Sequence, residues 1–271
     1  MHKTIYQLGV IGNPINHSLS PFIHQQFAQQ FRLDISYLKL KPDTDFEQLV
    51  SDCQQQSYYG LNITAPFKQT AYQLAHTLGP QAQKAQAVNT LTFKAGHIHG
   101  DNTDGDGLVR ALTHHHHCPI EGSNLLILGA GGAARGILPA LCNAQPRHIT
   151  IANRTLSKAQ KLCDIISDTI DTQAYCLEQT ILQSFDIIID TTFGLESQPV
   201  LLNKLNCSPN ALWYDLKYHH HPAWLQSWLD NNHCQFANGL SMLIEQAAVS
   251  FAIWTGYEPD TFVVWQALNE L

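Results

Sequence analysis

The chain has 271 residues, of which 44% are hydrophobic and 14% are charged, and its formal net charge at pH 7 is −7. A nucleic-acid-binding protein would normally carry a basic face, so the negative charge argues against that class. No run reaches the roughly 18 apolar residues that a membrane span needs. The N-terminal stretch MHKTIYQLGVIG also lacks the marks of a signal peptide. We therefore expect a soluble cytoplasmic protein with one large domain or two modest ones.

Short strand-like runs alternate with helix-like segments along the chain. In the first part the expected strands are YQLGVIG, SYLKL and YGLNIT, and the expected helices are PFIHQQFAQQF, DFEQLVSDC and KQTAYQLAHTL. TLTFKAGHIHGD indicates two short strands around a glycine turn. Further strands are expected at NLLILG, HITIAN, FDIIID and ALWYDL. This order of strands and helices predicts an α/β fold in which helices cover parallel sheets.

Two further segments bear on the domain organisation. HHHHCPIEGS (114–123) is polar and rich in turn formers, and it precedes the apolar strand NLLILG. A domain boundary is therefore expected near residues 103–121. The stretch GLSMLIEQAAVSFAIWTG repeats apolar residues at helical spacing, which predicts a long helix with a broad buried face.

The stretch NLLILGAGGAARGIL has the form of a strand, a glycine turn and a helix. Gly129, Gly131 and Ala134 satisfy the dinucleotide-binding fingerprint G-x-G-x-x-G/A. The first glycine permits the tight turn, the second lets the backbone approach a pyrophosphate, and the alanine lets the helix pack on the strand. The start of the helix would offer free N–H groups to the phosphates. A glycine turn without a ligand is the alternative, and the flanking strand and helix favour the nucleotide site.

The residues that would face the ribose distinguish the two nicotinamide cofactors. NAD sites usually hold an acidic residue about 20 positions beyond the fingerprint. Counting from Ala134 (153 − 134 = 19), this position is Asn153, which is followed by Arg154 and, four positions on, by Lys158. A guanidinium suits a phosphate dianion, and cations are unfavourable at a helix start unless an anion binds there. We predict NADP(H), with Arg154 and Lys158 at its 2′-phosphate; two solvated charges are the alternative.

Four polar clusters precede the glycine turn, and each lies next to a predicted strand. They are GNPINHSLSP (12–21), GLNITAPFK (60–68), AVNT (87–90) and GDNTDGDG (100–107). Ligands of parallel α/β sheets lie beyond the carboxyl ends of the strands. We expect all four clusters to follow such ends and to form a site together. Their side chains suit a small ligand with many hydroxyls and one anionic group, although each residue alone is more often a turn former. The candidates are Ser18, Ser20, Asn62, Thr64, Lys68, Asn89, Asn102 and Asp104.

In the same order, the motifs GNPINHSLSPFIHQQF, GLNITAPFK, AVNT, GDNTDGDG, GAGGAARG, NRT and GLSMLIEQAA resemble those of the shikimate dehydrogenase family, from residue 9 to about residue 256. The resemblance implies an oxidoreductase of the shikimate pathway that reduces 3-dehydroshikimate to shikimate with NADPH, in aromatic amino-acid biosynthesis. It also implies an α/β fold of two domains. Residues 1–104 plus 238–271 would form a three-layer α/β substrate-binding catalytic domain, and residues 105–237 an inserted Rossmann-type NADP-binding domain.

The resemblance further implies roles for individual residues. Lys68 and Asp104 would be the catalytic pair, because a lysine ammonium can stabilise and protonate the oxygen that gains charge when hydride arrives. The residues that would bind the substrate are Ser18, Ser20, Thr64, Asn89, Tyr218 and Gln246. Those that would bind the cofactor are Gly129, Ala130, Gly131, Gly132, Ala133, Asn153, Arg154, Thr155, Lys158, Leu216, Gly239 and Met242.

The chain departs from the family pattern at three places. Asp190 stands where the family usually has an asparagine, a position that bears on the contacts under the nicotinamide. Lys158 stands where arginine is commoner, and HHHPAWL follows Tyr218 where the family often has a proline-rich turn.

Other interpretations stay open. The histidine runs 114–117 and 219–221 could bind metal, but neither has the spaced partners of a closed site, so we expect no metal and a solvated first run. An NAD-dependent quinate/shikimate dehydrogenase is the enzymatic alternative, and the missing acid at position 153 argues against it. A paralogue acting on a related polyhydroxy acid is the third. We expect a small-molecule substrate and no nucleic-acid or membrane partner, and the sequence is compatible with a homodimer.

Overall fold

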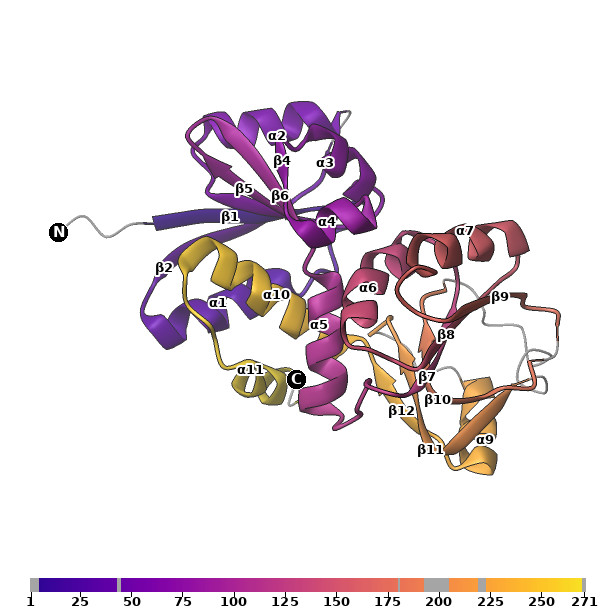
Figure 1. The fold of residues 1–271 in the computed structure, drawn as a ribbon. Coiled ribbons are helices and arrows are strands. Elements are labelled where there is room, and N and C mark those ends of the chain that lie inside the picture. Colours follow the sequence, from indigo (N-terminus) through magenta and orange to yellow (C-terminus); the bar gives the residue numbers. More distant parts are fainter. Residues whose placement is uncertain (1–4, 43–44, 180, 193–204, 219–222, 270–271) are drawn as a thin grey trace. The chain divides into compact units, whose positions relative to one another are not determined.

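The computed structural model describes residues 5–42, 45–179, 181–192, 205–218 and 223–269 (Figure 1). The chain forms two compact units, which we call unit 1 (residues 1–108 and 243–271) and unit 2 (residues 109–242). The domain borders expected from the sequence, at 104/105 and 237/238, lie a few residues before these positions. None of the described helices is long and apolar enough to cross a membrane.

Unit 1 is built on a six-stranded mixed sheet with the order β2-β1-β3-β5-β6-β4. Strands β1 (Ile5–Ile11), β2 (Asp34–Leu40) and β3 (Gly60–Ile63) are parallel. β5 (Thr90–Lys94) and β6 (His97–Asp101) form the expected hairpin, in which β5 is antiparallel to β3, and the short strand β4 (Thr77–Leu78) lies beside β6.

Helices cover both faces of this sheet (Figure 1). α1 (Ser20–Phe31) and α10 (Leu240–Thr255) lie on one face, and α2 (Phe46–Gln55) and α3 (Lys68–Leu74) lie on the other. The remaining helices are α4 (Pro80–Ala85), α5 (Asp104–Arg110) and α11 (Thr261–Asn269). The three-layer α/β arrangement predicted from the sequence is confirmed.

Helix α3 is shorter than predicted. Apolar periodicity through KQTAYQLAHTL indicated a helix to Leu78, but α3 ends at Leu74. The cause is a pair of hydrogen bonds with β6: His76 N donates to Ile98 O at 2.8 Å, and Ile98 N donates to His76 Nδ1 at 2.9 Å. These bonds draw Thr77 and Leu78 to the edge of the sheet as β4.

A histidine lies within the aromatic core of unit 1. His24 of α1 has no exposed surface, and its ring stacks on Tyr37 with 4.4 Å between ring centroids and an interplanar angle of 13°. Trp254 and Phe251 of α10 lie at centroid distances of 5.5 and 6.2 Å. Burial lowers the pKa of His24 to about 3, so the ring is neutral near pH 7.

Unit 2 is built on a six-stranded parallel sheet with the order β12-β11-β10-β7-β8-β9. Read from β9, this order is 3-2-1-4-5-6, the arrangement of a Rossmann fold. The strands are β7 (Asn124–Leu128), β8 (His148–Asn153), β9 (Thr172–Cys176), β10 (Ser184–Asp190), β11 (Asn206–Asp215) and β12 (Gln235–Asn238). The predicted Rossmann-type domain is confirmed.

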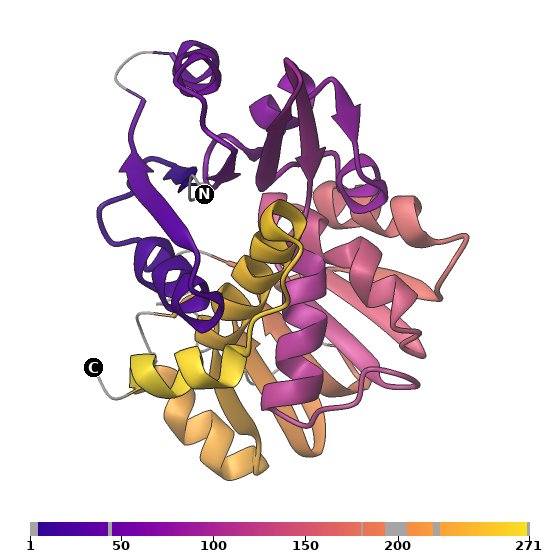
Figure 2. The same cartoon turned by 90° about the vertical axis from the view of Figure 1, so that its left-hand side faces the viewer.

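The central strand β7 shows why the sheet is covered on both sides. Residues 125–128 have no exposed surface, and their side chains point alternately to the two faces. Leu126 and Leu128 join a core that includes Trp213 and Trp228. Helices α6 (Gly132–Asn143) and α7 (Leu156–Ile166) lie on one face and α9 (Ala223–Asn232) on the other (Figure 1, Figure 2).

The first histidine run is only in part the solvated connection expected from its composition: His114 and His117 are exposed, but the run begins within a helix. α5 continues into a π-helical turn (Ala111–His115), in which Ala111 and Leu112 are fully buried. His116 Nε2 lies 3.0 Å from Ser241 Oγ, and the ring packs edge to face on Tyr214. Burial lowers the pKa of His116 to about 4. Composition alone could not show that this ring faces inward. The second run, 219–221, lies outside the described residues.

The buried His24 should make the protein sensitive to acid. Its folded pKa of about 3 is below the ordinary 6.5, so the unfolded chain takes up a proton first as the pH falls. Stability is therefore complete above pH ~6.5 and declines below it, by roughly 1.4 kcal/mol per pH unit for this group. His24→Phe should reduce the loss of stability between about pH 7.5 and 4.5 by roughly 2–3 kcal/mol, measured by urea unfolding.

The same change at the exposed His97 serves as the matched control and should leave the pH dependence as in the original chain. If the His24→Phe and unmodified proteins lose stability in parallel over this range, the histidine is not buried in its neutral form.

Candidate active site

The polar clusters predicted from the sequence meet at one edge of the unit 1 sheet. β1 and β3 end there. β5 runs antiparallel to β3, so Asn62 at the end of β3 pairs with Thr90 at the start of β5. β6 in turn ends beside the start of β5, where Thr90 pairs with Asp101. The expectation that all clusters follow carboxyl ends was wrong for AVNT, because that cluster precedes an antiparallel strand.

An ion pair joins two of these loops. Lys68 is the first residue of α3 and Asp104 the first residue of α5, and Lys68 Nζ donates to Asp104 Oδ2 at 2.5 Å. The side chains are 26% and 10% exposed, so the pair is partly shielded but open to a ligand. The ammonium has two further N–H groups, which donate to no residue in the described ranges.

Asn89 fixes the other side of the Asp104 carboxylate. Its Nδ2 donates to Asp104 Oδ1 and to Thr103 Oγ1, both at 2.9 Å. Its Oδ1 accepts from Thr103 N and from the Thr90 hydroxyl, also at 2.9 Å. The amide is therefore satisfied on both ends and buried. Both carboxylate oxygens of Asp104 are held, one by Asn89 and the other by Lys68.

Helix α10 contributes two residues to this network. Gln246 Oε1 lies 3.3 Å from Asn89 Nδ2, and Gln246 O accepts from the Thr103 hydroxyl at 3.0 Å. Ser250, one turn later, bonds to the hydroxyl of Thr90 at 2.8 Å and to Asn62 Nδ2 at 3.1 Å. Thr90, Thr103 and Ser250 were not among the residues predicted from the sequence. The only signal for Ser250 was its position four residues after Gln246, on the same helix face.

Ser18 and Thr64 lie in the loops after β1 and β3 at the same edge, and Ser20 is the first residue of α1. Ser18 Oγ donates to Ser20 Oγ at 3.2 Å. A side chain at Gly12 would collide with Thr64, so glycine allows the two loops to touch. The structure thus brings Lys68, Asp104, Asn89 and Gln246 into one hydrogen-bonded cluster, with Ser18, Ser20 and Thr64 on the same edge. Tyr218, predicted to contact the substrate, belongs to unit 2 and is half-buried.

The carboxyl edge of the unit 2 sheet carries the glycine turn. Gly129 has φ +101°, a conformation that favours glycine, and an added Cβ would lie 2.5 Å from Thr191 Oγ1. Gly131 and Gly132 are exposed and face open space. No side chain caps the start of α6, so its first N–H groups are free to bind an anion. The turn therefore fits a pyrophosphate.

The end of β8 presents the predicted phosphate-binding cations. Arg154 and Lys158 are exposed, and neither forms an ion pair with any described residue. Asn153 Nδ2 donates to Thr155 O at 2.9 Å and so shapes the turn before α7. Two such cations beside a helix start fit the extra phosphate of NADP.

Backbone contacts fix the remaining predicted cofactor residues. A side chain at Gly239 would collide with Leu216 O, so these segments touch, and Gly239 N donates to Lys217 O at 3.1 Å. Met242 N donates to Tyr214 Oη at 3.0 Å, and Tyr214 Oη lies 2.9 Å from Ser241 Oγ. Tyr214 and Ser241, which hold the start of α10, were not predicted from the sequence.

Two buried carboxylates end neighbouring strands at this edge. Asp190 of β10 and Asp215 of β11 are register partners and are 3% and 1% exposed. Burial raises the pKa of both, that of Asp215 to about 6; the charge of Asp190 also raises the pKa of Asp215, while Lys217 opposes the shift. Lys217 Nζ lies 3.5 Å from Asp215 Oδ2.

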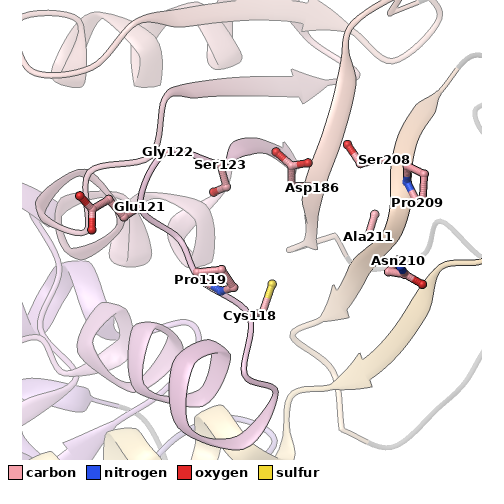
Figure 3. Close-up of a pocket in the computed structure, with 10 residues that line it drawn as sticks. All are labelled: Cys118, Pro119, Glu121, Gly122, Ser123, Asp186, Ser208, Pro209, Asn210 and Ala211. Carbon is pink, nitrogen blue, oxygen red and sulfur yellow. The ribbon is translucent and has the colours of Figure 1, made fainter.

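A pocket of about 330 Å³ lies at the opposite, amino edge of the same sheet (Figure 3). Its lining includes Cys118, Glu121, Asp186 and Asn210. It is therefore separate from the edge that carries the glycine turn. Among the described residues no group of three or more histidine, cysteine or acidic side chains could hold a metal ion.

Family models match three parts of the chain. Residues 10–91 match the shikimate dehydrogenase substrate binding domain, residues 111–207 match shikimate / quinate 5-dehydrogenase, and residues 239–268 match the shikimate 5′-dehydrogenase C-terminal domain. Together these matches cover most of the chain.

Individual proteins agree with the family match. The chain is 41% identical to shikimate dehydrogenase (NADP(+)) of Methylobacillus flagellatus, over 96% of this chain and 97% of the relative. It is 43% identical to the protein of the same name from Chromobacterium violaceum, over 97% of each chain. The crystal structure of shikimate 5-dehydrogenase from Thermus thermophilus, in complex with NADP(H) and shikimate, matches with a TM-score of 0.85 and 28% identity, over 98% of this chain and 99% of that one. This chain belongs to the shikimate dehydrogenase family.

Proposed function

We propose that this chain catalyses the reversible, NADPH-dependent reduction of 3-dehydroshikimate to shikimate, in aromatic amino-acid biosynthesis in the cytoplasm. The observation that carries the proposal is the Lys68–Asp104 ion pair, at 2.5 Å, where the polar loops of unit 1 converge. The names of the relatives at 41% and 43% identity point to the same reaction and cofactor.

The residues at this edge match the chemistry of the substrate. The hydroxyls of Ser18 and Ser20 can donate to its carboxylate, and Thr64 and Gln246 can bind its hydroxyls as donors and acceptors. Asn89 would bind a substrate hydroxyl in exchange for one of its present hydrogen bonds. The role of Tyr218 in substrate binding, which the family resemblance implies, stays a prediction. Because Asn89 is already held by four hydrogen bonds, it presents a fixed surface to the ring.

Lys68 would act as the general acid. NADPH, when bound, supplies the hydride. As the carbonyl oxygen gains negative charge, the Lys68 ammonium stabilises that charge and donates its proton. Asp104 keeps the ammonium aimed at the reacting oxygen and accepts a hydrogen bond from a neighbouring substrate hydroxyl. In the reverse direction neutral Lys68, or a water, takes up the proton.

The residues that would hold NADP(H) lie at the carboxyl edge of unit 2. The free N–H groups at the start of α6 would bind the pyrophosphate, and Arg154 with Lys158 would bind the 2′-phosphate. Asn153, Thr155 and Ala130 to Ala133 would line the adenosine half, and Leu216, Gly239 and Met242 the nicotinamide half.

The direct test is the oxidation of NADPH by purified protein with either 3-dehydroshikimate or 3-dehydroquinate. We expect rapid turnover of the first and little of the second. Equal or faster turnover of 3-dehydroquinate would instead assign the chain to the quinate-using alternative.

Lys68→Ala should lower kcat by about two orders of magnitude or more, because the proton donor is lost. Shikimate should still bind, since the serines, Thr64 and Gln246 remain; calorimetry measures this. Lys84→Ala, at an exposed lysine of α4, is the control and should keep normal kcat. Near-normal turnover of the Lys68 variant would remove this residue from the mechanism.

Arg154→Ala should lower kcat/KM for NADP by about tenfold or more while the value for NAD changes little, because only NADP carries the extra phosphate. Lys161→Ala, an exposed cation on the same helix as Lys158, should leave both values unchanged. An equal loss with both cofactors would show that Arg154 does not select NADP.

Substitution by alanine should have different effects at the two fingerprint glycines, Gly129 and Gly131. At Gly131 a methyl group meets no atom within 4 Å, so Gly131→Ala should keep its thermal midpoint but bind NADP about tenfold or more weakly. Gly129→Ala should itself be destabilised, because φ is +101° and Thr191 is close. Calorimetric scanning and cofactor titration separate the outcomes, and undiminished NADP binding by Gly131→Ala would contradict the proposed pyrophosphate site.

A further inference from the structure

The neighbouring carboxylates of Asp190 and Asp215 have no role in the function proposed so far. Their side chains are the most deeply buried charges at the carboxyl edge of unit 2, within the described residues, and the strands place them directly side by side. Within the described ranges, Lys217 is the one cation whose charge acts on both carboxylates. With both acids ionised, the three groups carry one net negative charge.

The strand order locates these charges relative to the proposed cofactor. In a Rossmann sheet the dinucleotide crosses the switch point, which here lies between β7 and β10. Arg154 follows β8, so the adenosine half belongs on that side. The nicotinamide half then belongs over β10 and β11, whose last residues are Asp190 and Asp215. The contact between Thr191 and the Gly129 position shows that the segment after Asp190 lies against the glycine turn.

The two redox forms of the cofactor differ in charge at this end. The nicotinamide ring of NADP⁺ is a cation, and that of NADPH is neutral. A negative charge held in a shielded position nearby stabilises the cation and has little effect on the neutral ring. We propose that Asp190 acts by its charge to favour binding of NADP⁺ over NADPH, relative to an asparagine at the same position. This inference rests on the proposed NADP site.

A purely structural role of Asp190 can be distinguished from the proposed role of its charge. Its Oδ1 accepts from Thr192 N at 2.9 Å and from the Thr192 hydroxyl at 2.6 Å. An asparagine retains an oxygen that can accept both bonds. Asp190→Asn therefore removes the charge while preserving the shape and the turn. Loss of structure would weaken the binding of NADP⁺ and of NADPH together. Loss of charge would change the ratio of their dissociation constants.

The experiment measures the dissociation constants of NADP⁺, NADPH and 2′,5′-ADP for the unmodified protein and for Asp190→Asn. It is performed at about pH 8, above the pKa of about 6 of Asp215. We expect the constant for NADP⁺ to rise about tenfold, and those for NADPH and for 2′,5′-ADP, which lacks the nicotinamide, to change by less than about twofold. Asp215→Asn should shift the ratio in the same direction, which keeps the test valid if the first variant folds poorly.

Asp186→Asn is the matched control. Asp186 lies at the other end of β10, beside the pocket in Figure 3, where its carboxylate accepts from Asn124 N at 2.8 Å. Removal of the Asp186 charge should not alter the ratio of the dissociation constants for NADP⁺ and NADPH. The inference is overturned if Asp190→Asn leaves the NADP⁺/NADPH ratio unchanged, or if Asp186→Asn changes it equally. If the unmodified protein binds none of the three ligands, the proposed function fails as well.

Discussion

The Asp104 carboxylate is the point on which the site in unit 1 depends. One oxygen accepts from the Lys68 ammonium and the other from the buried amide of Asn89. Charge-assisted hydrogen bonds of this kind are strong and directional. Because Asn89 also bonds to Thr90 and Thr103, the position of Lys68 depends on β5, α5 and α10. A network satisfied in this way gives a preorganised donor, which is what proton transfer to a developing oxyanion requires.

Unit 2 has to bind a large anionic ligand, and most of the groups that it offers for this are uncharged. Its open glycine turn and uncapped helix offer N–H groups, and exposed Arg154 and Lys158 offer charge where the ligand is most anionic. At the other half of the edge the balance is reversed when the buried Asp190 and Asp215 are both ionised, since their two charges then outweigh that of Lys217. The edge therefore runs from positive to negative in the direction expected for a dinucleotide whose nicotinamide becomes cationic on oxidation.

The local sequence predicts much of this architecture, because strands, glycine turns and helix starts follow from neighbouring residues. The two sheets, the hairpin of β5 and β6 and the glycine turn all follow in this way. The contacts of Thr103 and Thr90 with α10 do not, because they join residues 143 and 160 positions apart. The early end of α3 depends on pairing with β6, and the inward face of His116 depends on Ser241 and Tyr214. In each case tertiary contacts override the local pattern. The sequence motifs identified Lys68 and Asp104 as candidates. The distance between their charged groups could come only from the fold.

The most direct measurement is the set of distances from shikimate to Lys68 and Asp104 in a crystal of the protein with shikimate and NADP⁺. We predict one hydroxyl oxygen of the substrate within about 3.2 Å of Lys68 Nζ, and a neighbouring hydroxyl within similar reach of Asp104. A substrate bound with Lys68 turned away from every one of its hydroxyl oxygens, while the Lys68–Asp104 ion pair stays intact, would contradict this mechanism.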